Sequence, residues 1–218
     1  MKKMKKYELT TNTIVHMGRT LYQIKALMNF GIISEGDLGG YIESEENLSQ
    51  EGNAWVSGNA CVSGNARVRG NAMVSGNAMV SGNAWVSGNA CVSGNARVRS
   101  DAWVSGNACV IDNSRVSDDA CVSGNAWVSG NACVRGNARV SRNADYTTIK
   151  GFGTEYRNTT FFRCEDGNVR VVCGCFYGTI DEFRERVKTT MTGKIAEEYL
   201  MIADLMEFHF REENTNDM

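Results

Sequence analysis

The sequence predicts a mainly β protein: a parallel β-helix of about five turns, an N-terminal β-rich cap and a small C-terminal α+β domain. Two observations predict this fold. A six-residue unit, Gly-Asn-Ala-X-Val-Ser, repeats without interruption from Gly52 to Val140, and its Val position holds Val in all fifteen units. The segments on either side do not repeat, and the whole chain has 23 Gly and no Pro. We therefore divide it into residues 1–51, 52–145 and 146–218.

The repeat unit suits a short strand followed by a corner. In Ala-X-Val-Ser, alternate side chains point to opposite faces, which places Ala and Val inside and X and Ser outside. Gly and Asn adopt positive φ most easily, so each Gly-Asn pair predicts a corner. A helix is excluded because each Gly costs about 1 kcal/mol and Val falls on no consistent helical face. The coils must therefore stack to make a core.

The pattern Val-Ser-Gly-Asn-Ala-X resembles that of the hexapeptide-repeat proteins across residues 52–140. This resemblance implies a left-handed parallel β-helix with three hexads per turn, and a homotrimer. Residues 37–43 (DLGGYIE), 47–49 (NLS), 159–162 (TTFF) and 174–179 (GCFYGT) extend the likeness to a family of phage and prophage proteins. That second resemblance implies a viral origin and the cytoplasm of an infected bacterial host, and it provides no site residues.

With eighteen residues per turn, outward X residues stack into three faces, and all four tryptophans occupy this X position. A contiguous apolar face usually marks an interface. We expect the wholly apolar first face to be covered by self-association or by the flanking segments. The first face, our candidate oligomer interface, holds Trp55, Met73, Cys91, Cys109 and Trp127; the second holds Cys61, Met79, Arg97, Arg115 and Cys133; the third holds Arg67, Trp85, Trp103, Cys121 and Arg139.

The second face predicts a basic strip. Arg97 would stack above Arg115, with Arg99 and Arg135 at neighbouring Ser positions. Stacked like charges repel unless water or an anion lies across them. The four arginines are therefore candidate ligand- or partner-binding residues.

Two tryptophans of the third face, Trp85 and Trp103, are candidate anchors for a macromolecular partner, because Trp and Arg are enriched at binding hot spots. The net charge of −2 gives no global reason to expect nucleic acid or an anionic membrane as the partner.

The N-terminal flank predicts a cap, because a β-solenoid exposes strand edges that would otherwise allow end-to-end growth. Residues 7–28 predict a hairpin with its turn at 17–19, and a further strand is expected near residues 36–43. Counting in sixes places Ile42 and Leu48 in the Ala position of the repeat. His16, on the hairpin, is expected to be structural.

The C-terminal flank predicts a second hairpin, with a two-residue turn at 166–167. That register places Arg163 opposite Arg170, with Phe161 beside them on one face. Two opposed arginines need an acidic neighbour or an anionic ligand between them. Glu165, Asp166 and Asp181 are the candidate neighbours; otherwise Arg163, Arg170 and Phe161 form an anion-binding pocket.

Two helices complete the predicted C-terminal domain. Residues 179–182 (TIDE) form a capping box that opens the first helix, and the second is expected over about residues 195–210. Cys173 and Cys175 do not predict a zinc site, because Cys164 would lie about 13 Å from Cys173 along the hairpin. We expect no metal and no cofactor.

These observations favour a binding protein over an enzyme. The hexapeptide acyltransferases that the repeat resembles use a histidine base, and here His16 and His209 both lie outside the repeats. The sequence has no apolar run of about 18 residues, so we expect a cytoplasmic protein. Its eight cysteines are then expected to be thiols, metal ligands or packing groups rather than disulfides. We expect it to engage a host protein or sequester a small anionic molecule, including in counter-defence. A virion spacer and an acyltransferase are the alternatives.

Overall fold

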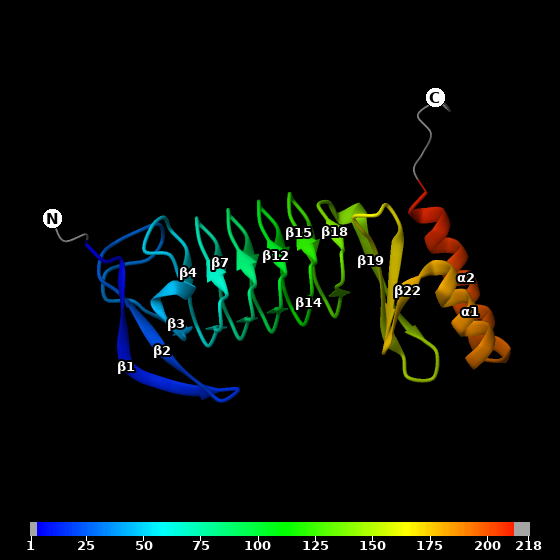
Figure 1. Cartoon of the computed structure of the whole chain (residues 1–218), viewed down its shortest axis with the longest axis horizontal. Coiled ribbons are helices and arrows are strands. Elements are labelled where there is room, and N and C mark those ends of the chain that lie inside the picture. The colour runs from blue at the N-terminus through cyan, green and yellow to red at the C-terminus, as the bar shows by residue number, and fades with distance from the viewer. Residues whose placement is uncertain (1–3, 212–218) are drawn as a thin grey trace, which may run out of the picture.

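A computed structural model describes residues 4–211 of the chain. It shows a prism of stacked coils, an antiparallel hairpin at its N-terminal end and an α+β domain at its C-terminal end (Figure 1). The mainly β class and the order of the three parts are as predicted. The outermost residues of the predicted end domains, 1–3 and 212–218, lie outside the described residues.

The prism is built from two-residue strands in three parallel sheets. The strands are β4 (Trp55–Val56), β5 (Cys61–Val62), β6 (Arg67–Val68), β7 (Met73–Val74), β8 (Met79–Val80), β9 (Trp85–Val86), β10 (Cys91–Val92), β11 (Arg97–Val98), β12 (Trp103–Val104), β13 (Cys109–Val110), β14 (Arg115–Val116), β15 (Cys121–Val122), β16 (Trp127–Val128), β17 (Cys133–Val134) and β18 (Arg139–Val140). Residues eighteen apart pair directly, which confirms the three predicted faces.

The core of the prism is a column of Val and Ala. Every Val of the repeat and every Ala from Ala54 to Ala138 is fully buried. The corners hold left-handed backbone: Gly88, for example, has a φ of 69°. Where Gly is replaced at a corner, Ser100, Asp112 and Asp118 adopt the same conformation, with φ near 60°. Small polar residues tolerate positive φ best after Gly, so these replacements keep the corner intact.

The solenoid has about six turns, rather than the five predicted. The additional coil comes from the segment before the repeats, where β3 (Leu38–Ile42) pairs in parallel with β5 and Leu48 bridges to Val68. Ile42 pairs with Val62, so Ile42 and Leu48 lie in the Val position of the coil. The prediction that they occupy the Ala position is wrong, because the first coil is two residues longer than the others.

The N-terminal cap is the predicted hairpin, formed by β1 (Tyr7–His16) and β2 (Arg19–Ala26), and β2 also pairs with β3. The cap covers one tryptophan of the solenoid. Trp55 is 1% exposed, with edge contacts to Tyr7 at 6.3 Å and Phe30 at 5.4 Å between ring centroids. Of the two coverings expected for the first face, the flanking segment is the one that buries Trp55, which therefore leaves the candidate oligomer interface.

The C-terminal domain is a four-stranded antiparallel sheet with two helices on the side away from the solenoid (Figure 1). Its elements are β19 (Tyr146–Phe152), β20 (Arg157–Arg163), β21 (Val169–Cys173), β22 (Phe176–Thr179), α1 (Ile180–Thr190) and α2 (Gly193–His209). One sheet face packs on the end of the solenoid through Phe162, Cys164 and Val172, and the other packs on the helices through Phe161 and Val171. The predicted capping box is present at the start of α1.

The hairpin between β20 and β21 has a different register from the one predicted. Phe162 faces Arg170, and Arg163 faces Val169. The turn contains three residues rather than two, because Gly167 has a φ of 77° and its N–H donates to the carbonyl of Cys164. A three-residue turn ending in a left-handed Gly shifts the pairing by one position. Consequently, Arg163 and Arg170 point to opposite faces of the sheet.

Short turns close both ends of the solenoid: η1 (Glu45–Asn47) and η2 (Asn143–Asp145). The carboxylate of Asp145, whose side chain is 4% exposed, accepts hydrogen bonds from the backbone N–H groups of Ser141 and Arg142, both at 2.9 Å. Burial alone would raise the pKa of Asp145, but these hydrogen bonds outweigh it and hold the pKa below the ordinary value of 3.8.

Asp145 is expected to make the stability of the protein pH-dependent. A carboxyl group with a lowered pKa stabilises the fold above its unfolded pKa, and this stabilisation is lost as pH falls through the folded pKa. Asp145→Asn should therefore be less stable than the wild type at neutral pH, and the difference should narrow below about pH 4. Urea unfolding at several pH values measures the difference in unfolding free energy between the wild type and the variant. A difference that stays constant down to about pH 2 would contradict a lowered pKa for Asp145.

Candidate anion-binding face of the solenoid

Four arginines gather on the second face of the prism. Arg97 and Arg115 are directly paired on β11 and β14, while Arg99 and Arg135 occupy the Ser position, two residues along from the outward residues of β11 and β17. Neighbouring rungs are about 4.8 Å apart, and two residues along a strand span about 6.6 Å. The four side chains therefore arise from one small area covering three rungs. We call these four residues the arginine quartet.

The quartet lacks the acidic partners that other arginines of this protein have. Among residues 4–211, no carboxylate pairs with any of the four, and their guanidinium groups form no hydrogen bond. By contrast, Arg139 pairs with Glu165 at 2.6 Å. Nε of Arg135 is buried without a hydrogen-bond partner among the described residues, and its guanidinium lies 4.7 Å from the centre of the Tyr177 ring. The quartet is thus a cluster of positive charge without an ion pair to any residue between 4 and 211.

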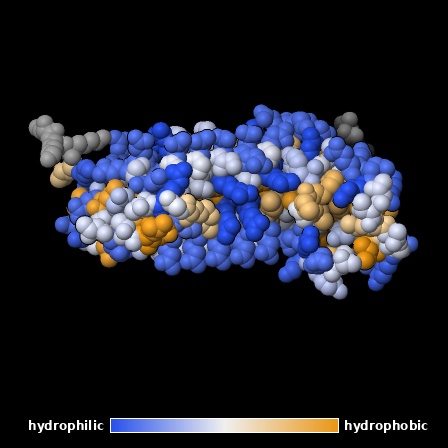
Figure 2. Space-filling view, turned by 60° about the horizontal axis from the view of Figure 1, so that its bottom comes forward, coloured by the Kyte–Doolittle hydropathy of each residue, from blue (hydrophilic) through white to orange (hydrophobic). Residues whose placement is uncertain are grey.

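Electrostatic effects on a nearby thiol show that three of these arginines converge. Burial raises the pKa of Cys133, and Arg135, Arg115 and Arg99 all act to lower it. Asp118, which also acts on this thiol, raises the pKa. Figure 2 shows that strongly hydrophilic residues gather near the middle of the prism, whereas hydrophobic residues gather towards both ends of the molecule. A concentrated positive patch of this kind attracts anions.

The predicted pocket of Arg163, Arg170 and Phe161 is not formed. Phe161 is fully buried between the sheet and the helices. Arg163 lies on that same face, where it donates a 2.8 Å hydrogen bond to the carbonyl of Phe210. The shifted hairpin register explains the separation, because it sends Arg170 to the opposite face. Arg163 and Phe161 therefore serve the packing of the C-terminal domain.

Arg170 lies on the solenoid side of the sheet, near the quartet. Asp166 pairs with Arg170 at 2.6 Å, as was one expectation, yet Nη1 of Arg170 is buried with no hydrogen-bond partner in residues 4–211. Burial raises the pKa of Tyr177, and both Arg170 and Arg135 act to lower it. The guanidinium of Arg135 lies 4.7 Å from the centre of the Tyr177 ring, and the charge of Arg170 also acts on the Tyr177 hydroxyl. Arg170 thus lies on the face of the sheet towards the solenoid, with its charge paired to Asp166.

The tryptophans of the third face form a stack. The rings of Trp85 and Trp103 are 5.6 Å apart with an angle of 28° between their planes. The guanidinium of Arg69 lies 4.7 Å from the centre of the Trp85 ring. Trp103 remains 48% exposed. The stack is thus covered by Arg69 at one end and open to solvent at the other.

Only part of the first face is open to an oligomer partner. With Trp55 buried, its remaining members are Met73, Cys91, Cys109 and Trp127. Met73 packs against the core, the two cysteines are half-buried, and Trp127 is 53% exposed. Any contact between copies along this face would therefore centre on its C-terminal half.

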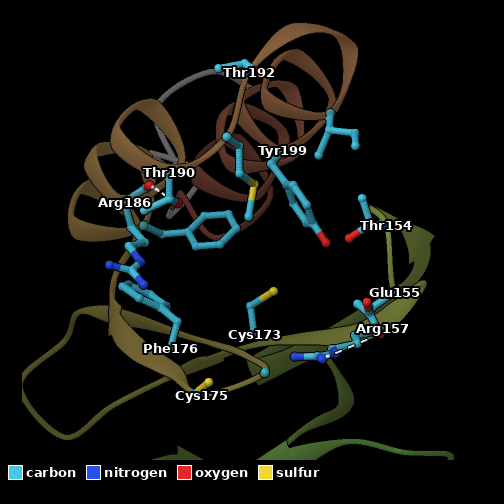
Figure 3. A pocket seen from close by; sticks show the side chains of 15 residues that line it. Thr154, Glu155, Arg157, Cys173, Cys175, Phe176, Arg186, Thr190, Thr192 and Tyr199 are labelled. Carbon is cyan, nitrogen blue, oxygen red and sulfur yellow. Dashed lines mark hydrogen bonds and ion pairs between the residues drawn. The ribbon is translucent and has the colours of Figure 1, made fainter.

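Sequence reasoning missed a cavity of about 480 Å³ in the C-terminal domain (Figure 3). The residues that line this cavity come from three turns and two helices, so no local sequence motif predicts the cavity. Neither His16 nor His209 lines this cavity. In the part of the chain that the structure describes, no group of three or more His, Cys, Asp or Glu side chains is arranged to hold a metal ion. No helix within residues 4–211 has the length and apolar character needed to cross a membrane.

The fold places the protein in the class of parallel β-solenoids built from short repeats. Within this class, residues 72–88 match a family model described as YdcK Beta solenoid repeat. The matched residues lie wholly inside the repeats and include β7, β8 and β9. No curated protein sequence matches the chain. The family match therefore supports a repeat β-solenoid and concerns the scaffold rather than the arginine quartet.

Proposed function

We propose that this protein is a non-enzymatic binding protein that docks an acidic surface of a protein partner on the arginine quartet. The observation that carries the proposal is the absence of any acidic partner for these four guanidinium groups within residues 4–211. Like charges on neighbouring rungs destabilise a sheet. A binding function explains why the chain keeps them together, since an anionic surface would turn the repulsion into charge-assisted hydrogen bonds.

The surroundings of the quartet favour a protein over a nucleic acid as partner. Met79 and Cys133 continue the same column of outward side chains on either side of the arginines. Arg, Met and Trp are enriched at protein interfaces, and the open ring of Trp103 lies on the neighbouring face. The net charge of −2 gives the molecule no general attraction for polyanions.

The setting that we propose follows from the resemblance to phage and prophage proteins. The partner is then a host protein in the cytoplasm of an infected bacterium, and binding blocks it, as in counter-defence. A homotrimer would use the open half of the first face around Cys109 and Trp127 and leave the quartet of each subunit free. The proposal that the quartet binds a partner does not depend on this setting or on the trimer.

Removing two arginines of the quartet is expected to weaken the binding of an acidic peptide. Arg97→Ala with Arg115→Ala should lower the affinity for a fluorescein-labelled oligoglutamate by about tenfold at low ionic strength, since each exposed charge pair contributes up to about 1 kcal/mol. Fluorescence anisotropy measures the affinity, and raising the salt concentration should weaken the wild type more than the variant.

The matched control removes the same charge from elsewhere. Arg19→Ala with Arg139→Ala deletes two exposed arginines that have acidic partners, Glu43 and Glu165, and should leave the affinity nearly unchanged. Equal weakening by both pairs, or no binding by the wild type, would contradict the proposal. A single-stranded DNA of the same charge that binds more tightly than the peptide would assign the face to nucleic acid instead.

A further inference from the structure

The cavity in the C-terminal domain has the shape of a small-molecule site. It lies where the turn between β19 and β20, the turn between β21 and β22, and the connection from α1 to α2 meet (Figure 3). Its volume of about 480 Å³ falls in the range of about 300–1,000 Å³ that is usual for ligand pockets. This cavity is separate from the arginine quartet, and none of the four arginines lines it.

Aromatic rings form one wall of the cavity. The ring of Phe183 lies 5.5 Å from that of Phe176 and 5.7 Å from that of Tyr199, measured between centroids. The hydroxyl of Tyr199 donates a hydrogen bond to the carbonyl of Phe152 at 3.2 Å, so it is already engaged. Phe183 and Tyr199 are buried and Phe176 is half-buried, so Phe176 offers the main ring surface to a planar or apolar ligand body.

Two arginines stand on opposite sides of this cavity (Figure 3). Arg157 has one long ion pair, at 3.7 Å from Glu155. The guanidinium of Arg186 makes no hydrogen bond and no ion pair with any residue between 4 and 211. The lining of the cavity therefore holds two guanidinium groups against one carboxylate, that of Glu155, and Arg186 has no acidic partner among residues 4–211.

Another arginine of α1 does form ion pairs with acidic side chains. Arg184, two residues before Arg186, pairs with Asp181 and Asp204, each at 2.8 Å, and with Glu207. Arg184 thus ties α1 to α2, which is a structural role. Arg186 is exposed and makes no comparable contact between the helices, so its guanidinium is free to pair with a ligand in the cavity.

We infer that this cavity binds a small organic anion that combines an aromatic body with a single carboxylate or sulfonate group. The aromatic body packs against Phe176, and the acidic group pairs with Arg186, with Arg157 on the opposite side. A guanidinium group presents several N–H donors in a fixed plane and matches the two oxygens of such a group. The inference is independent of the proposed function, because it uses none of the residues of the quartet.

Two dyes with the same type of aromatic body test the inference. The anion 8-anilinonaphthalene-1-sulfonate should bind the wild-type protein at one saturable site per chain, with an increase in fluorescence. Arg186→Gln should weaken this binding by about tenfold, the effect of losing one charge-assisted contact. The uncharged N-phenyl-1-naphthylamine should bind more weakly than the anion, and its affinity should not change in the variant.

The controls separate this site from the quartet and from nonspecific adsorption. Arg97→Ala with Arg115→Ala should leave the binding of the sulfonate dye unchanged, while circular dichroism confirms that Arg186→Gln remains folded. Unchanged sulfonate affinity in Arg186→Gln, or equal affinity of the two dyes for the wild type, would overturn the inference. Loss of sulfonate binding in the quartet variant would move the site to the solenoid and would also overturn it.

Discussion

Replacing Gly88 by Val is expected to lower the free energy of unfolding by about 3 kcal/mol, from left-handed strain and overpacking together. Gly88 forms a corner of the prism with a φ of 69°, a conformation that a β-branched residue strongly resists. A Cβ at this position would lie 2.8 Å from the carbonyl oxygen and 2.9 Å from the nitrogen of Gly106 on the next coil. Both coils would have to move apart, which breaks the ladder between them.

Gly130→Val is the matched control for this substitution. Gly130 occupies the same position of the repeat with a φ of 66°, but a Cβ there would meet nothing within 4 Å. Gly130→Val should lower the free energy of unfolding only by the left-handed backbone strain, about 1–2 kcal/mol. Urea unfolding of the two variants gives both values. Equal losses of stability in the two variants would show that the neighbouring coil can move away without an energetic penalty. That result would contradict close stacking of the corners.

Asn47→Ala is expected to lower the free energy of unfolding by about 4 kcal/mol, because it leaves several buried backbone groups without partners. Asn47 is fully buried in the first coil. Its Oδ1 accepts hydrogen bonds from the N–H groups of Glu43 and Ser44, at 3.1 and 2.9 Å. Its Nδ2 donates to the carbonyls of Gly64 and Ala66, both at 2.9 Å. One side chain thus ties η1 to the coil above it.

Asn89→Ala provides the comparison for Asn47→Ala. Asn89 belongs to an exposed ladder of side-chain amides, accepting from Asn71 at 3.0 Å and donating to Asn107 at 2.9 Å. Water can replace these hydrogen bonds, so the loss should stay below about 1 kcal/mol. Thermal or urea unfolding distinguishes the two. Similar losses for both variants would mean that burial of Asn47 does not determine its contribution.

The repeat determined most of what could be predicted, because a fixed period fixes which side chains share a face. Once eighteen residues make a turn, the pairing of Arg97 with Arg115 and of Trp85 with Trp103 follows from counting. The same count fails at Ile42 and Leu48, where two additional residues enter the first coil. A period carries no information about the segment that precedes it.

The remaining features depend on contacts between segments that no local pattern connects. Burial of Trp55 requires Phe30 and Tyr7 from the cap. The separation of Arg163 from Arg170 depends on a single left-handed glycine, Gly167, which changes the turn by one residue. The aromatic cavity needs three turns to meet. Sequence reasoning therefore found the arginines of the quartet and missed the cavity.

The most direct test of the central claim, that the arginine quartet is the binding face, is an NMR titration of the arginine Nε–Hε resonances with oligoglutamate. The Nε–Hε resonances of Arg97, Arg99, Arg115 and Arg135 should shift and saturate together, with Arg135 among the most affected because its Nε has no hydrogen-bond partner within the part of the chain that the structure describes. Arg139 and Arg184, which already pair with carboxylates, should stay unchanged. Shifts spread evenly over all arginines, or confined to Arg157 and Arg186, would contradict the claim.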